Sequence, residues 1–323
     1  MRDDSVPLGQ RRTTRRGVLR GAVGAALGLT LAGGALTSGA VAAPRKPALA
    51  LGPKDWMAAL PDSRGIDDLV IPGTHNSCAT VGGPFDTAKC QELSLPELLD
   101  LGVRYLDIRC RPIDGAFTIH HGAVYQKKNF HDVLSDCRTF LTANPGETVL
   151  MSVKKEHSDA SDEEFASIFN DLYMDQEGFD DLVYRESDGI PTLGDVRGKV
   201  VLIARQPDIG GLDWGDTGLL SVQDDYQLPV AEKWARVQEH LDGAAEEGEG
   251  ASRLWLNYVS TTTGEPIPLP SRYAEELNPM VEERLRGEYD AGEHPLYGAV
   301  ILDFAGTAAP GLPEAIYQLN AAG

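Results

Sequence analysis

Residues 67–77, DDLVIPGTHNS, are typical of a buried strand that delivers polar side chains to a cleft. The run of Leu, Val and Ile favours a strand, and the Pro-Gly that follows it favours a turn. Polar residues from Thr74 to Ser77 come directly after the glycine. A histidine in such a place is by itself more often an ordinary turn residue than a catalytic one. The significance of His75 therefore depends on what the other strands carry at their ends.

The chain contains eight apolar runs of this kind, each ending in polar or charged residues. They are LVIPGTH (69–75), VRYLDIR (103–109), FTIHH (117–121), TVLMSVKK (148–155), KVVLIAR (199–205), LLSVQDDY (219–226), RLWLNY (253–258) and GAVILDF (298–304). Helical patterns lie between several of them, over residues 94–102, 129–144, 230–243 and 271–287. The last of these contains an Asn-Pro pair able to kink or divide a helix. Alternating strands and helices predict an α/β fold, an irregular (β/α)₈ TIM-type barrel in a single domain.

The irregularity is expected at residues 110–116, because this connection is too short to hold a helix. Its Asp114-Gly115 pair predicts a hairpin turn, and so an antiparallel pair of strands within the barrel. A doubly wound sheet is the alternative fold. That fold normally has a Gly-rich phosphate loop after its first strand, which is missing here.

The N-terminal segment has the order of a removable export signal. A twin arginine in TTRRGVLR (13–20) precedes a small-residue apolar stretch that ends in AVAAP (40–44), a cleavage pattern. A transmembrane anchor is the alternative, but the stretch is rich in Gly and Ala. We expect a secreted protein exported by the twin-arginine route. The expected organisation is a signal peptide over 1–43, a linker over 44–55 and a catalytic barrel over 56–323.

The charge of the chain limits its partners. A formal net charge of −20 disfavours nucleic acid and strong attachment to anionic membranes. We expect no nucleic-acid partner, a transient contact with membrane surfaces, and a monomer, since nothing in the sequence indicates an oligomer. Trp234 and Tyr273 are candidates for the membrane contact, although core packing is the commoner role for either.

Four cysteines, Cys78, Cys90, Cys110 and Cys137, follow the leader. An even number of cysteines in an exported protein predicts two disulfides, and four cysteines allow three pairings. The shortest loops favour Cys78–Cys90 and Cys110–Cys137. A zinc site is the alternative, but neither a C-x-x-C pair nor a close Cys/His spacing supports it.

The polar residues at the strand ends predict an active site, because catalytic groups of such barrels lie at the carboxyl ends of the strands. Any one of these residues is as easily explained as a structural polar group whose hydrogen bonds are satisfied within the protein. The set as a whole is not, because it combines imidazoles, guanidiniums, an ammonium and carboxylates. Paired imidazoles suit a general base and a general acid, and arginine suits phosphate oxygens. The set is His75, Asn76, Asp107, Arg109, His120, His121, Lys154, Lys155, Arg205, Asp224, Tyr226, Asn257 and Asp303. It predicts cleavage of a phosphodiester by a hydroxyl group, with no metal required, and the tyrosine suits a polyol ring.

Eight motifs in one order then resemble the bacterial phosphatidylinositol-specific phospholipases C. They are IPGTHNS, YLDIRCR, IHHGAVY, NPGETVLMSVKKE, GKVVLIAR, SVQDDY, WLNY and ILDF. The resemblance runs from about Trp56 to the C-terminus. It implies a distorted barrel that cleaves phosphatidylinositol or glycosylphosphatidylinositol in membranes to diacylglycerol and inositol 1,2-cyclic phosphate.

The same resemblance implies a role for each matching residue. His75 would be the general base for the inositol 2-hydroxyl, His121 the general acid, and Asp303 the carboxylate that orients His75. Arg109 would stabilise the charged transition state. Binding of the inositol would fall to Lys154, Arg205, Asp224 and Tyr226.

Asn76 departs from the family pattern. Metal-free bacterial members have Asp directly after the first histidine, where it helps the arginine and the general acid. His-Asn is the pattern of calcium-dependent eukaryotic-type enzymes, but those have an acidic residue where this chain has Arg109. The positive charge of Arg109 takes the place of a metal. We expect no metal and no cofactor, with Ca²⁺ at Asn76 as the alternative.

Two other functions remain open from the sequence. A glycerophosphodiester phosphodiesterase would need a His-Arg-Gly start and acidic metal ligands, which are missing. A non-catalytic inositol- or glycan-binding barrel would have no need for two histidines and an arginine at the strand ends.

Overall fold

The computed structural model describes residues 51–262 and 267–321. The signal peptide expected over residues 1–43 lies outside the described residues, as does the first part of the expected linker. Leu51 is buried, and its carbonyl accepts a hydrogen bond from the Gln318 side chain at 2.9 Å. In the part of the chain that is described, no helix combines the length and the apolarity needed to cross a bilayer.

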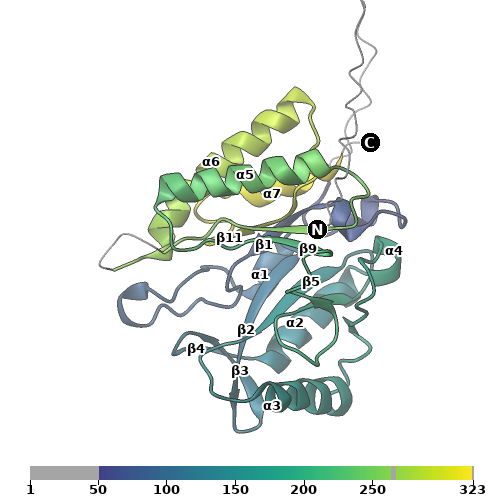
Figure 1. Cartoon of the computed structure of the whole chain (residues 1–323), viewed down its shortest axis with the longest axis vertical. Coiled ribbons are helices and arrows are strands. Elements are labelled where there is room, and N and C mark those ends of the chain that lie inside the picture. The colour runs from purple at the N-terminus through teal and green to yellow at the C-terminus, as the bar shows by residue number, and fades with distance from the viewer. Residues whose placement is uncertain (1–50, 263–266, 322–323) are drawn as a thin grey trace, which may run out of the picture. The chain divides into compact units, whose positions relative to one another are not determined.

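The described strands form one sheet, most of it parallel (Figure 1). Its hydrogen-bonded order is β6-β7-β5-β2-β1-β11-β10-β9, with β8 beside β7 and the β3–β4 hairpin beside β2. The sheet is curled but does not close. Among the described residues, β6 and β9, the strands at the two ends of this path, do not pair with each other. The strands are β1 (Val70–Thr74), β2 (Tyr105–Ile113), β3 (Ala116–His121), β4 (Val124–Asn129), β5 (Val149–Lys155), β6 (Val183–Tyr184), β7 (Val200–Ala204), β8 (Leu212–Asp213), β9 (Leu220–Gln223), β10 (Leu254–Tyr258) and β11 (Gly298–Leu302).

The expectation of an irregular barrel is confirmed, and all eight apolar runs contain strands. Seven lie parallel in the sheet, whereas β3 pairs antiparallel with β2, as the short connection predicted. Asp114 and Gly115 in that turn have φ values of 51° and 77°, a conformation that asparagine, aspartate and glycine tolerate best. β4, β6 and β8 were not expected; the latter two have only two residues each.

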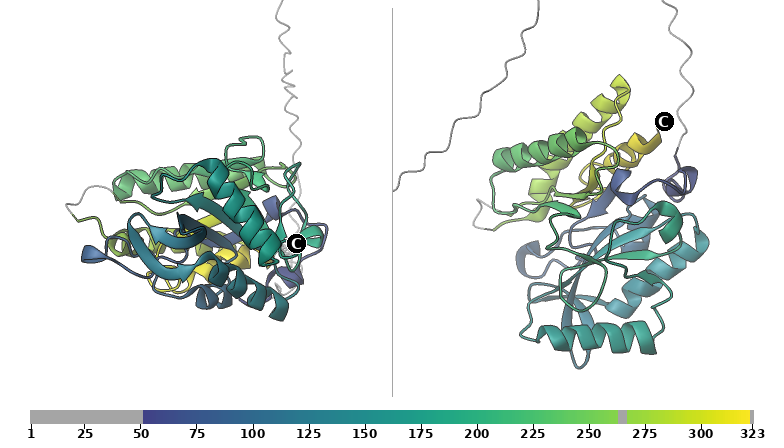
Figure 2. Two further views of the ribbon diagram at one scale, coloured as in Figure 1. Left: turned by 90° about the horizontal axis from the view of Figure 1, so that it is seen from below. Right: turned by 45° about the vertical axis from the view of Figure 1, so that its right-hand side comes forward.

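The helices that cover the sheet begin where capping residues predict. Ser94 with Glu97 and Asn129 with Asp132 form capping boxes at the starts of α1 and α2. Figure 1 shows α5, α6 and α7 above the curled sheet and α2 and α3 below it, as does the right-hand view of Figure 2. All five helices pack against the same, outer face of the sheet. The helices are α1 (Leu95–Asp100), α2 (Phe130–Ala143), α3 (Asp162–Ser167), α4 (Leu193–Val196), α5 (Val230–Glu247), α6 (Pro270–Ala291) and α7 (Leu312–Gln318), with a π-helix η4 (Ile168–Gln176) and short 3₁₀ turns η1 (Met57–Ala59), η2 (Ile66–Asp68), η3 (Pro84–Asp86) and η5 (Leu319–Ala321).

Helix α6 continues through Pro279 rather than dividing there. Proline removes only one hydrogen bond from the long helix. The neighbouring Asn278 is buried and donates its side-chain amide to the carbonyl of Asp303 at 2.9 Å. The Asn-Pro pair therefore ties α6 to the end of β11.

Both faces of the parallel strands are buried, which explains why the runs are almost wholly apolar. Tyr105, Leu150 and Ile301 belong to the cluster inside the curl. Leu106, Met151 and Leu302, their neighbours in sequence, belong to the cluster under the outer helices. Polar residues are therefore tolerated mainly where the strands end.

A buried ion pair joins the opposite end of the sheet to the segment before β1. Arg104 and Glu147 are both inaccessible to solvent, with Nε and Oε2 2.9 Å apart. Arg104 also donates to the carbonyls of Leu99 and Pro53, and Glu147 accepts from the Ala58 backbone N–H. This pair fixes the start of β2 against the start of β5.

We expect the Arg104→Met variant to lose about 3–5 kcal/mol of unfolding free energy, because it leaves the Glu147 carboxylate buried without a cation. Urea denaturation measures the loss. The matched double variant Arg104→Met/Glu147→Met removes both charges and should recover most of it. A single variant as stable as the unmutated protein would contradict this role.

Candidate active site

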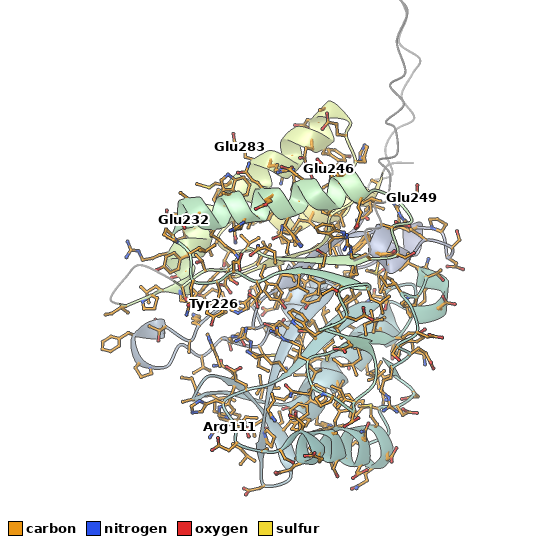
Figure 3. The ribbon with its side chains drawn as sticks, viewed as in Figure 1. Arg111, Tyr226, Glu232, Glu246, Glu249 and Glu283 are labelled. Atoms are coloured by element: carbon orange, nitrogen blue, oxygen red, sulfur yellow. The ribbon has the colours of Figure 1, made fainter. Side chains whose placement is uncertain are left out.

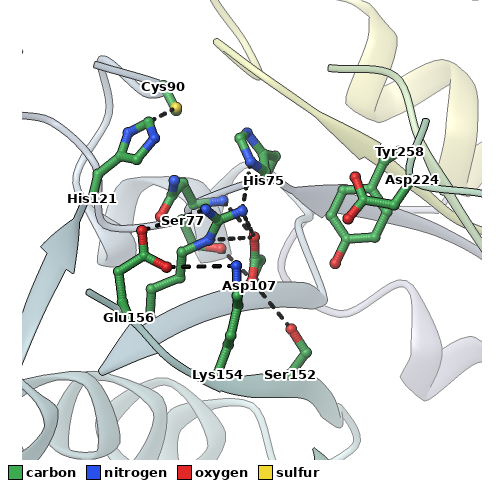
Figure 4. Close-up of polar contacts among 12 residues, drawn as sticks. His75, Ser77, Cys90, Asp107, His121, Ser152, Lys154, Glu156, Asp224 and Tyr258 are labelled. Atoms are coloured by element: carbon green, nitrogen blue, oxygen red, sulfur yellow. Dashed lines mark hydrogen bonds and ion pairs between the residues drawn. The ribbon is translucent and has the colours of Figure 1, made fainter. Parts of the chain in front are cut away.

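The predicted site residues converge because parallel strands bring their carboxyl ends to one edge of the sheet. Thr74 of β1 lies opposite Leu302 of β11, so the residues that follow them, His75 and Asp303, are neighbours. Arg109 of β2 lies opposite Lys154 of β5 in the same way. Figure 4 shows His75 between the hairpin that carries His121 and the segment that carries Asp224.

His75 is held from both sides of its ring. Its Nδ1 lies 2.8 Å from Oδ1 of Asp303, and its Nε2 lies 2.8 Å from Nη2 of Arg109. A guanidinium only donates hydrogen bonds, so Nε2 must accept and carries no proton. The proton of the ring is therefore on Nδ1 and is donated to Asp303. This is the tautomer that a general base requires.

Arg109 is fixed by a buried carboxylate beneath it. Its Nε and Nη2 donate to Oδ2 of Asp107 at 3.3 and 3.1 Å. Burial acts to raise the pKa of Asp107, but Arg109, Arg205 and the backbone N–H of Asn76 outweigh it and hold the pKa well below its usual range. Asp107 was among the strand-end residues but had no predicted role. It keeps the guanidinium charged and oriented.

His121, the last residue of β3, faces His75 across the site. The two ring centroids are 6.4 Å apart, at an interplanar angle of 84°. Nδ1 of His121 donates to the carbonyl of Ala88 at 2.9 Å, which leaves Nε2 for the site. Burial lowers the pKa of His121, and the Ala88 carbonyl partly offsets this. His120 belongs to the other face of β3, where its ring lies against Tyr125.

Glu156 is a charged group that the sequence analysis missed. Its Oε1 accepts from the backbone N–H of Gly122 at 2.7 Å, directly after His121. The same carboxylate lies 3.8 Å from Nη1 of Arg109 and 3.5 Å from Nζ of Lys154. Burial acts to raise its pKa, but Arg109 and the Gly122 N–H lower it overall. Its position two residues after Lys154 in one extended segment was the available signal.

Arg205 and Asp224 come together beside this centre. Nη2 of Arg205 lies 3.9 Å from Oδ2 of Asp224, and the guanidinium lies 3.8 Å above the ring of Trp214. Nη1 of Arg205 is buried without a hydrogen-bond partner among the described residues. Trp214 was not predicted. Together these residues leave N–H and carboxylate groups available to a polar ligand.

The other two predicted binding residues, Lys154 and Tyr226, lie nearer the surface than Arg205. Lys154 is still partly buried, and this burial and the charge of Arg109 lower its pKa. Tyr226 is 50% exposed on the segment after β9, and Figure 3 shows it below the end of α5 that carries Glu232. An aromatic ring nearer the centre is Tyr258, whose centroid lies 6.1 Å from that of His75. Lys155 instead forms an ion pair with Asp162.

The donor atoms around His75 do not fit Ca²⁺, which takes six to eight oxygen ligands. Within the described ranges, the one group of three His, Cys, Asp or Glu residues close enough to hold an ion is His75, Cys90 and Asp303. It offers a nitrogen, a sulfur and a carboxylate. Asn76 is buried, and its side-chain nitrogen has no hydrogen-bond partner among those residues.

The two expected disulfides are not formed, and this prediction is wrong for the described structure. Cys78, Cys90, Cys110 and Cys137 are all free and buried thiols. Cys90 lies at the site, with Sγ 3.7 Å from Nδ1 of His121, whereas Cys78 belongs to the core under the helices. Burial raises the pKa of all four thiols, which disfavours the thiolate form that reacts.

Known proteins share both this sequence and this fold. The family model described as the phosphatidylinositol-specific phospholipase C X domain matches residues 69–206. A 1-phosphatidylinositol phosphodiesterase of Listeria monocytogenes is 31% identical over 273 residues, which cover 78% of this chain and 81% of that protein. One of Staphylococcus aureus is 28% identical over 299 residues, covering 84% of this chain and 94% of that protein.

Solved structures that superpose on this chain belong to the same enzyme family as its sequence relatives. A mutant of the Staphylococcus aureus phosphatidylinositol-specific phospholipase C superposes with a TM-score of 0.73 at 27% identity, covering 84% of this chain and 99% of that one. The Listeria monocytogenes enzyme gives a TM-score of 0.71 at 28% identity, with 83% and 98% coverage.

We expect His121 to titrate below the ordinary histidine pKa of about 6.5, because its ring is buried. The Glu156→Gln variant keeps the hydrogen bond to Gly122 but removes a charge that favours the imidazolium. Its His121 should therefore titrate lower still. NMR titration of the imidazole signals measures both values. Glu177→Gln, which removes a carboxylate bonded to the exposed His131, is the matched control. An unchanged or higher His121 pKa in Glu156→Gln would contradict the assignment.

Proposed function

Because this chain belongs to the bacterial phosphatidylinositol-specific phospholipases C, we propose that it cleaves phosphatidylinositol, or a glycosylphosphatidylinositol, at a membrane surface. The products would be diacylglycerol and inositol 1,2-cyclic phosphate. The relatives named 1-phosphatidylinositol phosphodiesterase support this substrate. The observation that carries the proposal is the base-competent His75 held by Asp303 and Arg109, with a second imidazole opposite.

The first chemical step uses the free lone pair of His75. Nε2 takes the proton of the inositol 2-hydroxyl while that oxygen bonds to phosphorus. The imidazolium that forms keeps its Nδ1–H on Asp303, whose charge stabilises it. Arg109 transfers its Nη2 donor from His75 to a phosphoryl oxygen, where it meets the charge that develops in the transition state.

The second half of the step releases diacylglycerol. The bond from phosphorus to the glycerol oxygen breaks, and that oxygen takes a proton from His121. The Ala88 carbonyl holds the Nδ1–H of His121, so the proton comes from Nε2. Because burial lowers the pKa of His121, the charged acid form depends on the carboxylate of Glu156 and on the bound phosphodiester anion. Hydrolysis of the cyclic phosphate reverses the two roles.

We assign binding of the inositol ring to the residues beside the catalytic pair. Lys154 and Arg205 would donate to ring hydroxyls and Asp224 would accept from one, while Tyr226 would cover the ring. The unpartnered Nη1 of Arg205 supports this assignment. The unpartnered side-chain nitrogen of Asn76 supports a role for it as a neutral hydrogen-bond donor to phosphate.

We propose that the reaction needs no metal. The guanidinium of Arg109 occupies the centre with its donors on His75 and Asp107, and it supplies the positive charge that a metal would otherwise provide. Ca²⁺ at Asn76 is the alternative that the assay below tests.

We further propose secretion through the twin-arginine route and action as a monomer, without nucleic-acid partners. The twin arginine in residues 13–20 supports the export route, and the net charge of −20 supports the absence of nucleic-acid partners. Acidic side chains along α5 and α6, including Glu232, Glu246 and Glu283 in Figure 3, favour zwitterionic over anionic surfaces.

The contact with the membrane is assigned to Phe85 rather than to the two predicted aromatics. Tyr273 is buried, and Trp234 packs partly buried against the core. Phe85, in the η3 turn, is 75% exposed. Its loop is joined to the site, because Ala88 binds His121 and Val81 exchanges hydrogen bonds with Gln126 of β4.

³¹P NMR of the purified protein with phosphatidylinositol tests the reaction. We expect inositol 1,2-cyclic phosphate to form first, at equal rates in EDTA and in added Ca²⁺. His75→Ala and His121→Ala should each lower kcat by about 10²–10⁴-fold, because each removes one proton-transfer group. His131→Ala, which alters an exposed histidine, is the control and should keep full activity. A need for Ca²⁺ would overturn the metal assignment, and absence of cleavage would overturn the function.

The Phe85→Ala variant should weaken binding to phosphatidylcholine vesicles by roughly 10-fold or more, since a buried aromatic ring contributes about 1.5–3 kcal/mol. Sedimentation with vesicles measures the binding, and hydrolysis of water-soluble inositol 1,2-cyclic phosphate should stay unchanged. Met280→Ala, on the exposed side of α6, is the matched control. Equal losses in the two variants would exclude a specific contact at Phe85.

A further inference from the structure

Helix α5 buries a lysine that the catalytic account leaves without a role. Lys233 is fully inaccessible to solvent, although it belongs to the first turn of α5. It shares the buried face of the helix with Val237, Leu241 and Ala244. A cation is unfavourable both in an apolar interior and at the positive end of a helix dipole. A buried ammonium therefore needs hydrogen-bond partners that compensate for its lost hydration.

The ammonium of Lys233 contacts the two residues that flank Asp224. Nζ donates to Oε1 of Gln223 at 2.8 Å and to the carbonyl of Asp225 at 3.1 Å. Oε1 of Gln223 also accepts from the backbone N–H of Asp225 at 2.9 Å. The turn at the end of β9 is therefore closed around Lys233, with Asp224 at its centre.

The same network reaches the next strand of the sheet. Nε2 of Gln223 donates to Oδ1 of Asn257 at 2.7 Å and to the carbonyl of Tyr258 at 2.9 Å. Asn257 donates in turn to the carbonyl of Val237, one turn along α5 from Lys233. Tyr258 is the residue whose ring lies edge-on to His75. Lys233 thus connects α5, β9 and β10 at the edge of the site.

The charges that face Lys233 come from three segments. Asp224 and Asp225 follow β9, and Asp303 follows β11; all three favour the ammonium form. His240 belongs to α5 itself, and burial lowers its pKa to about 4. Burial lowers the pKa of Lys233 to about 8, so the charge is present at neutral pH and is lost as the pH rises through that value. Because the pKa in the folded state lies below that of an unfolded lysine, keeping this charge buried costs stability at neutral pH.

We infer that Lys233 is a positioning residue for the inositol site, which holds the Gln223–Asp225 turn so that the carboxylate of Asp224 stays aimed beside Arg205. The inference rests on the proposed function, in which Asp224 binds a hydroxyl of the inositol ring. It assigns specificity for the polyol to a side chain that itself touches no substrate. Loss of the Lys233 charge or of its hydrogen bonds should weaken ring binding, with little effect on the proton transfers at His75 and His121.

The test compares unmutated protein with Lys233→Met, an apolar residue of similar length, using myo-inositol as a competitive inhibitor of phosphatidylinositol cleavage in detergent. We expect Ki for myo-inositol and KM to rise by about 10-fold or more, as for a lost hydrogen bond to a charged group. The change in kcat should be smaller. The thermal midpoint should stay level or rise, because an apolar side chain often replaces a buried charge without loss of stability. In the unmutated protein Ki should rise above about pH 8, and in Lys233→Met this rise should be smaller, with only the titration of Lys154 left to cause it.

Val237→Ala is the matched control, because it loosens the same face of α5 without removing a charge. It should lower the thermal midpoint and leave Ki unchanged. The inference is overturned if the unmutated protein is active and Lys233→Met keeps its Ki, or if Val237→Ala raises Ki equally. An inactive unmutated protein overturns the proposed function together with the inference. If Lys233→Met does not fold, a Ki of the unmutated protein that stays flat between about pH 7 and 9 overturns it.

Discussion

The hydrogen bonds on the two nitrogens of His75 are the constraint on which the site depends. Asp303 takes the proton of Nδ1, and Arg109 donates to Nε2, so one tautomer satisfies both contacts. Three strands must be in register to place these side chains, since His75 follows β1, Asp303 follows β11 and Arg109 belongs to β2. The register of the parallel sheet thus sets the tautomer of the base.

The site contains buried charged side chains, most of which are compensated by an opposite charge or by hydrogen bonds. Asp107 and Glu156 are buried carboxylates, and each is stabilised by Arg109 and by a backbone N–H. Lys233 is the exception, since its two hydrogen-bond acceptors are neutral and its carboxylate neighbours only face it. Of these groups, Lys233 is the one whose pKa shift shows that burial disfavours its charge.

Much of this could be predicted because strands and their ends follow local rules. Apolar runs buried on both faces are easily recognised, and their terminal residues gave His75, Arg109, His121 and Asp303 before any geometry was known. The roles of Glu156 and Lys233 depend on which segments meet in space. Glu156 follows two lysines and reads as a solvated charge, and Lys233 reads as the polar face of a helix.

The errors have physical causes too. Short loops suggested disulfides, but pairing depends on where thiols lie, and Cys90 lies at the site. The Asn-Pro pair in α6 suggested a kink or a division, and the helix is not divided there, since Asn278 is anchored on Asp303. Helices α3 and η4 were missed, although Ser161 and the acidic residues after it are an ordinary helix start.

The most direct test of the account is ¹⁵N NMR of the His75 ring in the resting protein at neutral pH, assigned by loss of its signals in His75→Ala. Long-range ¹H–¹⁵N correlations distinguish the two tautomers. The account predicts a proton on Nδ1 and an unprotonated Nε2. In Asp303→Asn this preference should weaken. A resting His75 that carries its proton on Nε2 could not accept from Arg109 or from a hydroxyl group, and would contradict the assignment of His75 as the base.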